Sequence, residues 1–192
     1  MQQTTLSDAL WQGENRLLRN VTLAILGSLA LWISAKIQVP FFPVPMTMQI
    51  FAILVIGMAY GSKLALATLL LYMAQGAAGL PVFAGTPEKG IGYLYMMGPT
   101  GGYLLGFVLA SFVVGKLAER GFDRSFATTL LAMVIGVAII YVPGILWLGT
   151  LVGWDKPVLE WGLYPFLPAE AFKIALATAV LPLAWKAVKR DA

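Results

Sequence analysis

The sequence predicts an all-α integral membrane protein with six transmembrane helices in a single domain over residues 1–192. Hydrophobic residues make up 59% of the chain and charged residues only 11%, whereas a soluble domain is about half apolar and a quarter charged. With a mean hydropathy of +0.82, a chain of this length cannot hide its apolar side chains in one water-soluble core. We therefore expect lipid to be the solvent for much of the surface.

The apolar stretches are long enough to cross a bilayer, which takes about 20 residues, or fewer where neighbouring helices shelter the ends. They cover about residues 17–37, 48–60, 62–76, 101–117, 125–151 and 163–187. Only Gly61 separates the second stretch from the third, which predicts a tight helical hairpin. Unpaired backbone amides are too costly in lipid, and the stretches lack the alternation of a β-barrel strand, so we expect helices.

The lysines and arginines predict the orientation, because the cytoplasmic ends of membrane helices are enriched in them. With the N-terminus inside, the inner ends carry Arg16, Arg19, Lys63, Lys116, Arg120, Arg124, Lys186, Lys189 and Arg190. The outer ends carry only Lys36, Lys89, Lys156 and Lys173. Both termini are therefore expected to be cytoplasmic. The net charge of +4 is interpreted as a topology signal and not as a nucleic-acid-binding surface.

The absence of whole residue types excludes several kinds of chemistry. The chain has no cysteine and no histidine, which excludes disulfides, thiol nucleophiles, Cys/His zinc sites and haem held by these residues. It also lacks the commonest general base. The glycines around Gly98–Tyr103 do not form a Walker A motif, so ATP hydrolysis is not expected. We therefore expect no catalytic residue and no metal site.

The segment between the first two helices is proline-rich and aromatic, and we call it the lid loop: Pro40, Phe41, Phe42, Pro43, Val44 and Pro45. Each proline fixes φ and biases the residue before it towards extended conformations. A stiff loop of this kind suits a lid over a small-molecule pocket, because little ordering entropy is lost on closure. Equally, Phe41 and Phe42 could simply anchor at the lipid headgroups.

The most informative polar residues are Glu170 and Lys173, which lie three apart on one face of the last helix. Ionisable groups at membrane depth are costly unless they are paired or lie in a wet cavity, so they are functional candidates. Lys173 could take a ligand carboxylate, and Glu170 could orient Lys173 or accept hydrogen bonds from ligand N–H groups. The alternative is an interfacial salt bridge with Lys173 snorkelling to the headgroups.

Other polar, aromatic and small residues leave two interpretations open. Gln49 and Gln75 could bind a neutral polar ligand or tie helices together. Tyr95, like the other aromatic residues near the helix ends, is more typical of an interfacial belt than of a pocket wall. Ala24 and Ser28 allow another helix to approach closely, either in a partner or within this chain.

Four motifs, in order along nearly the whole chain, resemble the BioY family, the biotin-capturing S components of energy-coupling factor (ECF) transporters. They are Val39-Pro40 with Pro43-Val44-Pro45, Thr47 and Gln49; Gly79-Leu80-Pro81-Val82-Phe83-Ala84-Gly85; Gly98-Pro99-Thr100-Gly101-Gly102-Tyr103; and Pro165-Phe166-Leu167-Pro168 with Lys173. The ordered set is far more specific than any one motif.

The resemblance implies an S-component-like bundle of six helices, whose extracellular loops cap biotin, in the bacterial plasma (inner) membrane. Biotin would be a transported ligand, with no cofactor and no enzymatic activity. The implied partners are the ECF transmembrane coupling protein and two cytoplasmic ATPase subunits. The alternatives are an S component for another small vitamin, or a non-catalytic structural membrane subunit.

The resemblance also implies site residues. Substrate binding falls on Thr47, Gln49, Phe83, Lys89, Tyr103, Glu170 and Lys173. Lys173 would meet the biotin carboxylate, with Gln49 and Glu170 near the ureido ring. Where the family has Gly-Asp-x-x-Lys, this chain has Ala169-Glu170-Ala171-Phe172-Lys173, so its acid is longer by one methylene group. Contact with the coupling protein would use Ala24 and Ser28, where many members have Ala-x-x-x-Ala.

Overall fold

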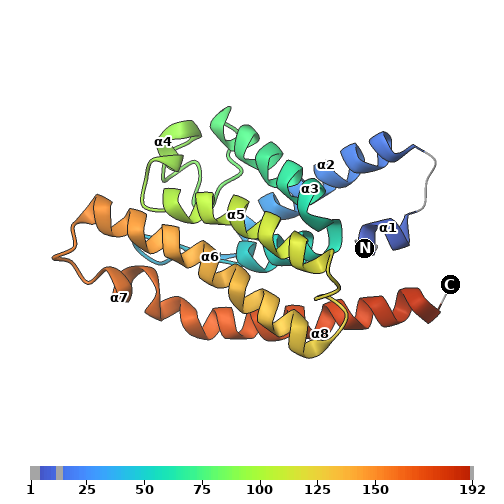
Figure 1. The fold of residues 1–192 in the computed structure, drawn as a ribbon. Helices are drawn as coiled ribbons and strands as arrows, with labels where there is room; N and C mark the ends of the chain where they lie inside the picture. Colours follow the sequence, from blue (N-terminus) through green and yellow to red (C-terminus); the bar gives the residue numbers. More distant parts are fainter. Residues whose placement is uncertain (1–4, 12–14, 191–192) are drawn as a thin grey trace.

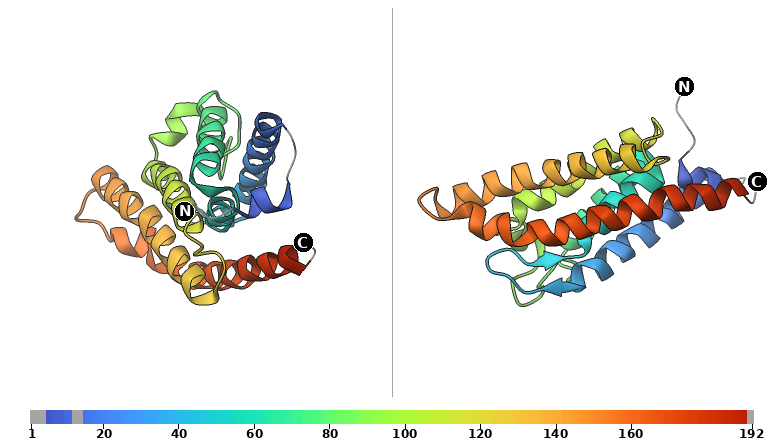
Figure 2. Two further views of the ribbon diagram at one scale, coloured as in Figure 1. Left: turned by 45° about the vertical axis from the view of Figure 1, so that its right-hand side comes forward. Right: turned by 90° about the horizontal axis from the view of Figure 1, so that it is seen from below.

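The computed structural model describes residues 5–11 and 15–190. Its long helices pack side by side in a bundle, with both ends of the chain at the same end of it (Figures 1 and 2). In chain order the elements are α1 (Leu6–Leu10), α2 (Arg16–Lys36), β1 (Gln38–Val39), β2 (Met46–Thr47), α3 (Gln49–Ala77), α4 (Gly92–Met96), α5 (Gly101–Ala118), α6 (Phe126–Val152), α7 (Val158–Gly162), the 3-10 helix η1 (Tyr164–Phe166) and α8 (Leu167–Arg190). The all-helical class expected from the sequence is confirmed.

Gly61 divides α3 into two helical segments. Its φ of 76° and ψ of 172° are not helical, and glycine adopts this positive φ at no steric cost. The Gln49 side-chain amide donates a hydrogen bond to the Tyr72 hydroxyl at 2.8 Å, although these residues are 23 positions apart. In one straight helix they would lie about 34 Å apart. The two segments therefore fold back on each other at Gly61, as Figure 1 shows.

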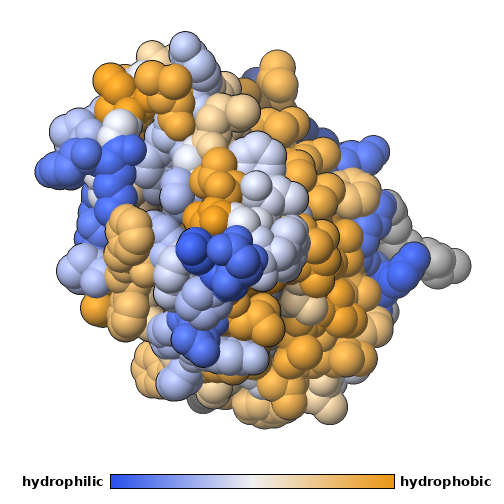
Figure 3. Space-filling model, turned by 90° about the vertical axis from the view of Figure 1, so that its left-hand side faces the viewer, coloured by the Kyte–Doolittle hydropathy of each residue, from blue (hydrophilic) through white to orange (hydrophobic). Residues whose placement is uncertain are grey.

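In the part of the chain that the structure describes, five helical stretches are long and apolar enough to cross a membrane: Arg16–Lys36, Gln49–Ala77, Gly101–Ala118, Phe126–Val152 and Val158–Val188, the last of which spans α7, η1 and most of α8. The sequence-based count of six differs because the 29-residue α3, counted here once, contains two of the expected stretches. Figure 3 looks onto the end of the bundle opposite the chain termini. Hydrophilic residues gather on that end, while hydrophobic residues dominate the flank, as expected for a chain surrounded by lipid.

Short elements between the long helices were not predicted. β1 and β2 pair antiparallel, with Gln38 opposite Thr47 and Val39 opposite Met46, and they close the base of the lid loop. The helix expected over residues 163–187 begins later, at Leu167, after α7 and η1. Leu163 has a non-helical φ of −132°, and Pro165 supplies no backbone N–H for a continuous helix.

We expect Gly61→Ala to lower the free energy of unfolding by about 1–2 kcal/mol, because an L-residue is strained at positive φ. Its Cβ would also lie 2.8 Å from the Thr5 side chain. Gly90→Ala is the matched control, since Gly90 has a φ of +94° but nothing within 4 Å of the added Cβ. Thermal unfolding in detergent should show the larger loss at Gly61. Equal losses would show that the contact with Thr5 adds nothing.

Candidate functional site

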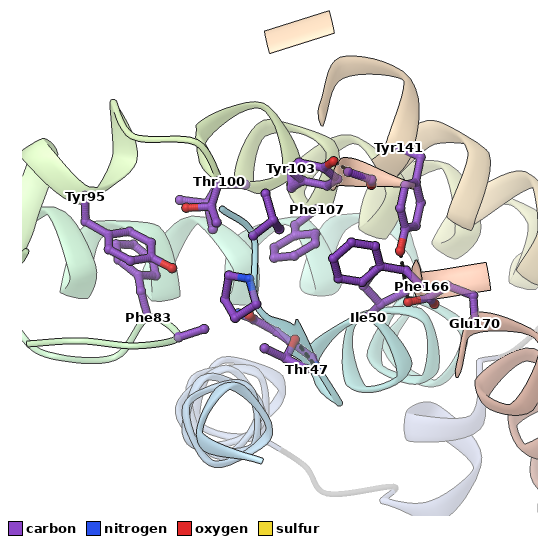
Figure 4. Close-up of a pocket in the computed structure, with 16 residues that line it drawn as sticks. Thr47, Ile50, Phe83, Tyr95, Thr100, Tyr103, Phe107, Tyr141, Phe166 and Glu170 are labelled. Atoms are coloured by element: carbon purple, nitrogen blue, oxygen red, sulfur yellow. Dashed lines mark hydrogen bonds between the residues drawn. The ribbon is translucent and has the colours of Figure 1, made fainter. Parts of the chain in front are cut away.

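A cavity lies beneath the lid loop, at the end of the bundle away from the chain termini. It encloses about 500 Å³, including its open mouth, of which about 40 Å³ admits the centre of a water molecule. Figure 4 shows the side chains that surround it, which come from the lid loop and from almost every helix. They are Val44, Pro45, Thr47, Gln49, Ile50, Phe83, Ala84, Tyr95, Thr100, Tyr103, Leu104, Phe107, Tyr141, Gly162, Phe166 and Glu170.

Glu170 is the one charged residue in this lining. It is only 2% exposed, and its Oε1 atom accepts hydrogen bonds from Lys173 Nζ at 2.8 Å and from the Tyr141 hydroxyl at 3.1 Å. Its Oε2 atom is buried and has no hydrogen-bond partner among the described residues. An unsatisfied buried carboxylate oxygen costs free energy. This atom is therefore suited to accept an N–H group from a ligand.

Lys173 is buried beside Glu170, at 4% exposed, and does not line the cavity. The two residues lie on one face of α8, as their spacing predicted. The snorkelling alternative does not describe this arrangement, because the ammonium group points to a buried carboxylate and not to the headgroups. The contact between Lys173 and a ligand carboxylate stays a prediction. In the described geometry Lys173 holds the acid that faces the cavity.

Gln49 begins the first segment of α3 and is 3% exposed. Its side-chain amide donates to the Tyr72 hydroxyl, which in turn donates to the Val82 carbonyl oxygen, both at 2.8 Å. The Thr47 hydroxyl accepts from the Gln49 backbone N–H at 3.2 Å. This chain of hydrogen bonds fixes the Gln49 amide in the cavity wall, so that a neutral polar group meets it at little cost in ordering entropy.

Phe83 forms an aromatic wall at one end of the cavity. Its ring stacks on Tyr95, with centroids 5.0 Å apart, and meets Tyr72 edge-on at 5.5 Å. The ring occupies the space that a side chain at position 76 would need: a Cβ on Gly76 would lie 2.0 Å from it. Burial raises the pKa of the Tyr95 phenol, partly offset by the Thr100 side chain, so the wall stays uncharged.

Tyr103 and Tyr141 form a second aromatic surface, at the Glu170 end. Their rings meet edge to face with centroids 5.7 Å apart, and the Tyr103 hydroxyl donates to the Gly162 carbonyl oxygen at 2.8 Å. Figure 4 shows Tyr141 and Glu170 at one end of the cavity and Phe83 with Tyr95 at the other. The cavity is therefore mostly apolar and aromatic, with a carboxylate at one end.

The lid loop covers this cavity. Val44 and Pro45 line it, and the Phe41 ring lies 5.9 Å from the ring of Phe166, another lining residue. Phe42 instead is 86% exposed. Pro40 and Pro43 are not among the lining residues. The two phenylalanines of the loop thus have different surroundings, although they are adjacent in the chain.

The family model described as "BioY family" matches residues 2–190. This chain belongs to the BioY family. The Biotin transporter BioY of Thermotoga maritima is 38% identical over 148 residues, covering 77% of this chain and 85% of its own. The Biotin transporter BioY2 of Lactococcus lactis subsp. cremoris is 32% identical over 170 residues, covering 86% and 89%.

The Probable biotin transporter BioY of Pyrococcus horikoshii is 36% identical over 148 residues, covering 77% of this chain and 85% of its own. A crystal structure of the S-component for biotin from an ECF-type ABC transporter superposes with a TM-score of 0.75. It covers 91% of this chain and 94% of its own at 23% identity, so this likeness shows that the two share a fold.

The residues taken from the BioY resemblance fall into two groups. Thr47, Gln49, Phe83, Tyr103 and Glu170 line the cavity. Lys89 and Lys173 lie outside the lining: Lys173 is buried beside Glu170, and Lys89 is exposed, with its stem packed over Gly85. Its role in binding stays a prediction.

The two small residues expected to contact the coupling protein, Ala24 and Ser28, differ in how exposed they are. Ser28 is 1% exposed and accepts a hydrogen bond from Gln75 at 3.3 Å, so in the described structure it packs inside the chain. Gln75 therefore ties two helices together, one of the interpretations left open. Ala24 is half-buried and lines a groove with Arg19 and Tyr60 near the terminal end. Ala24 alone of the pair has surface for a partner.

Several lining residues were not predicted. Tyr141 and Phe166 lie outside the residues assigned to substrate binding, and Tyr95 was assigned to an interfacial belt. Tyr141 carried a usable signal: a tyrosine in the middle of an apolar helix needs a hydrogen-bond partner for its hydroxyl. For metals, residues 5–11 and 15–190 contain no group of three His, Cys, Asp or Glu side chains that could hold an ion.

Proposed function

We propose that this chain is the biotin-binding, substrate-capture subunit of an ECF-type biotin uptake transporter. The observation that carries the proposal is the cavity beneath the lid loop of a BioY-family chain, with the Glu170 Oε2 atom in its wall and without a hydrogen-bond partner among the described residues. The related biotin transporters and the S-component fold support it. The chain captures its ligand for transport and catalyses no reaction, so biotin is a transported substrate and not a cofactor.

The chemistry of the cavity matches biotin. The ureido ring of biotin carries neutral N–H donors, which suit the Glu170 Oε2 atom, and its apolar thioether ring suits the aromatic walls around Phe83 and Tyr103. The biotin carboxylate would be repelled by Glu170. In place of the contact between Lys173 and the carboxylate expected from the sequence, we therefore place the ureido ring at Glu170 and the carboxylate towards the other end. Lys173 then acts through Glu170.

The cavity has to widen when biotin enters. The space that admits the centre of a water molecule is only about 40 Å³, and biotin is much larger than a water molecule. Val44 and Pro45 of the lid loop line the cavity, and the Phe41 ring of this loop contacts another lining residue, Phe166. We infer that this contact opens to admit biotin and closes over it.

Two adjacent residues of the lid loop, Phe41 and Phe42, should affect biotin release differently. Phe41→Ala removes the aromatic pair with Phe166, which is worth about 0.5–1.5 kcal/mol, so biotin should dissociate about two- to tenfold faster. Phe42→Ala removes an 86% exposed ring and should leave dissociation unchanged. Stopped-flow release of labelled biotin measures both. Equal effects of the two variants would contradict a lid that closes through Phe41.

The proposed arrangement in the membrane follows from the fold. If the two segments of α3 cross separately, the chain crosses six times as one domain over residues 1–192, which suits both termini at one end of the bundle (Figure 2). The excess of lysine and arginine at that end favours the cytoplasm, so the cavity would face outward across a bacterial plasma membrane. The coupling protein and the ATPase subunits would assemble on the cytoplasmic side, with Ala24 on the contact face.

Selectivity among vitamins tests the proposal. Purified protein should bind labelled biotin saturably, and unlabelled biotin should displace it at far lower concentration than thiamine or riboflavin. High-affinity binding of another vitamin, with none of biotin, would instead make the chain an S component for that vitamin. If the protein binds none of these vitamins, the alternative of a non-catalytic structural membrane subunit is favoured.

A further inference from the structure

The segment 82–86 carries part of the cavity wall and is held by side chains outside the cavity. Phe83 and Ala84 line the cavity. The Tyr72 hydroxyl donates to the Val82 carbonyl oxygen at 2.8 Å. On the other side, Lys36 Nζ lies 3.0 Å from the Phe83 carbonyl oxygen, the Thr86 carbonyl oxygen and the Thr86 hydroxyl. The segment is thus anchored to α3 at its start and to the end of α2.

Lys36 uses its full donor capacity on this segment. A lysine ammonium group has three N–H donors, and each has an oxygen of Phe83 or Thr86 within reach. The Thr86 hydroxyl also donates to the Phe83 carbonyl oxygen at 2.6 Å, so the anchored atoms form one network. Phe83 is 1% and Thr86 6% exposed, whereas Lys36 is exposed. Lys36 therefore contacts the segment on its solvent-facing side and does not line the cavity.

Two glycines, Gly79 before the segment and Gly85 within it, give the backbone there little resistance to movement. Gly79 and Gly85 have φ values of +92° and +70°, a region in which glycine is unstrained and retains more conformational freedom than other residues. Without Lys36, the hydrogen bond from Tyr72 and the packing of the Phe83 ring would be left to hold the wall. A small displacement of this wall changes the space offered to a ligand.

We propose that Lys36 is a positioning residue for biotin, which fixes the cavity wall at Phe83 and Ala84 without contacting the ligand. This inference rests on the proposed function and adds to it a residue outside the cavity. It distinguishes Lys36 from a cation that pairs with the biotin carboxylate, because all three donors of Lys36 are already engaged.

Lys36→Met tests the proposal, since methionine keeps most of the apolar stem and removes the donors. We expect the dissociation constant for biotin to rise about five- to tenfold, a moderate loss because the hydrogen bonds are partly exposed. Biotin methyl ester, which lacks the carboxylate charge, should lose affinity by the same factor. Loss for biotin alone would make Lys36 a direct carboxylate ligand and overturn the proposal.

Three further variants separate positioning from general effects. Lys36→Arg keeps charged donors and should recover part of the affinity. Lys156→Met removes a lysine from the α6–α7 connection, where it pairs with Asp155 at 3.2 Å, and should bind both ligands as the wild type does. Thr86→Val removes one acceptor and leaves Lys36 in place, so it should weaken both ligands by a smaller, equal factor, even if Lys36→Met does not fold.

The outcomes separate this inference from the proposed function. If wild-type protein does not bind biotin, the proposed function is wrong. If wild-type protein binds biotin but Lys36→Met or Thr86→Val binds both ligands unchanged, only the positioning role of Lys36 is wrong.

Discussion

Glu170→Gln should raise the dissociation constant for biotin by about 10- to 150-fold, since a hydrogen bond to a charged group is worth about 1.5–3 kcal/mol. Glutamine has the size of glutamate, but it replaces one carboxylate oxygen with an N–H₂ group. The donor would then oppose the N–H groups of the ureido ring, or the remaining oxygen would lose its charge. Isothermal titration of the purified variant with biotin measures the effect.

Two further variants separate the effects of Glu170→Gln: one removes the charge that it leaves behind, and the other removes a single hydrogen bond to Glu170. Lys173 is buried, and a buried charge without its partner destabilises a protein by about 3–5 kcal/mol. The double variant Glu170→Gln with Lys173→Met should therefore recover thermal stability without recovering affinity. Tyr141→Phe removes one hydrogen bond to Oε1 and should cost only about two- to tenfold in affinity. Wild-type affinity in a folded Glu170→Gln variant would remove Glu170 from the site.

Phe83→Ala should have the largest effect on stability, because deleting a buried phenylalanine costs about 3–5 kcal/mol of unfolding free energy. The ring is 1% exposed and contacts both Tyr72 and Tyr95, and its removal opens a hole against Gly76. The variant should also lose biotin binding, since this ring forms one end of the cavity. Unfolding in denaturant and biotin titration check the two effects separately.

Phe42→Ala is the matched control for this change. It deletes the same side chain from an 86% exposed position, where substitutions usually alter stability by less than about 0.5 kcal/mol. If Phe83→Ala unfolds as late as Phe42→Ala and still binds biotin, Phe83 is not part of the cavity wall in solution.

The parts of the fold that could be predicted are those set by lipid and by single residues. An excess of apolar residues requires helices in a bilayer, and one glycine between two short apolar stretches indicated where the chain turns. The spacing of Glu170 and Lys173 placed them on one face. That spacing could not decide which of the two faces the cavity, because both side chains point to the same side of α8.

The remaining parts depend on contacts between distant residues. α5 and α6 are apolar almost all round, so periodicity does not distinguish their lipid-facing side from their inner side. The contact of Tyr141 with Glu170 joins residues 29 positions apart and depends on how α6 is rotated relative to α8. Likewise, the sequence could not decide whether Ser28 packs against a partner or inside the chain. Its hydrogen bond with Gln75 depends on how two helices pack together.

A structure of the protein with biotin bound tests the central claim most directly. It should show biotin beneath the lid loop, with a ureido nitrogen at about 2.7–3.2 Å from Glu170 Oε2, the distance of an N–H to oxygen hydrogen bond. The biotin rings should lie against the aromatic walls, with the carboxylate towards Phe83 and Tyr95. Biotin bound outside this cavity, or with its carboxylate against Glu170, would contradict the account.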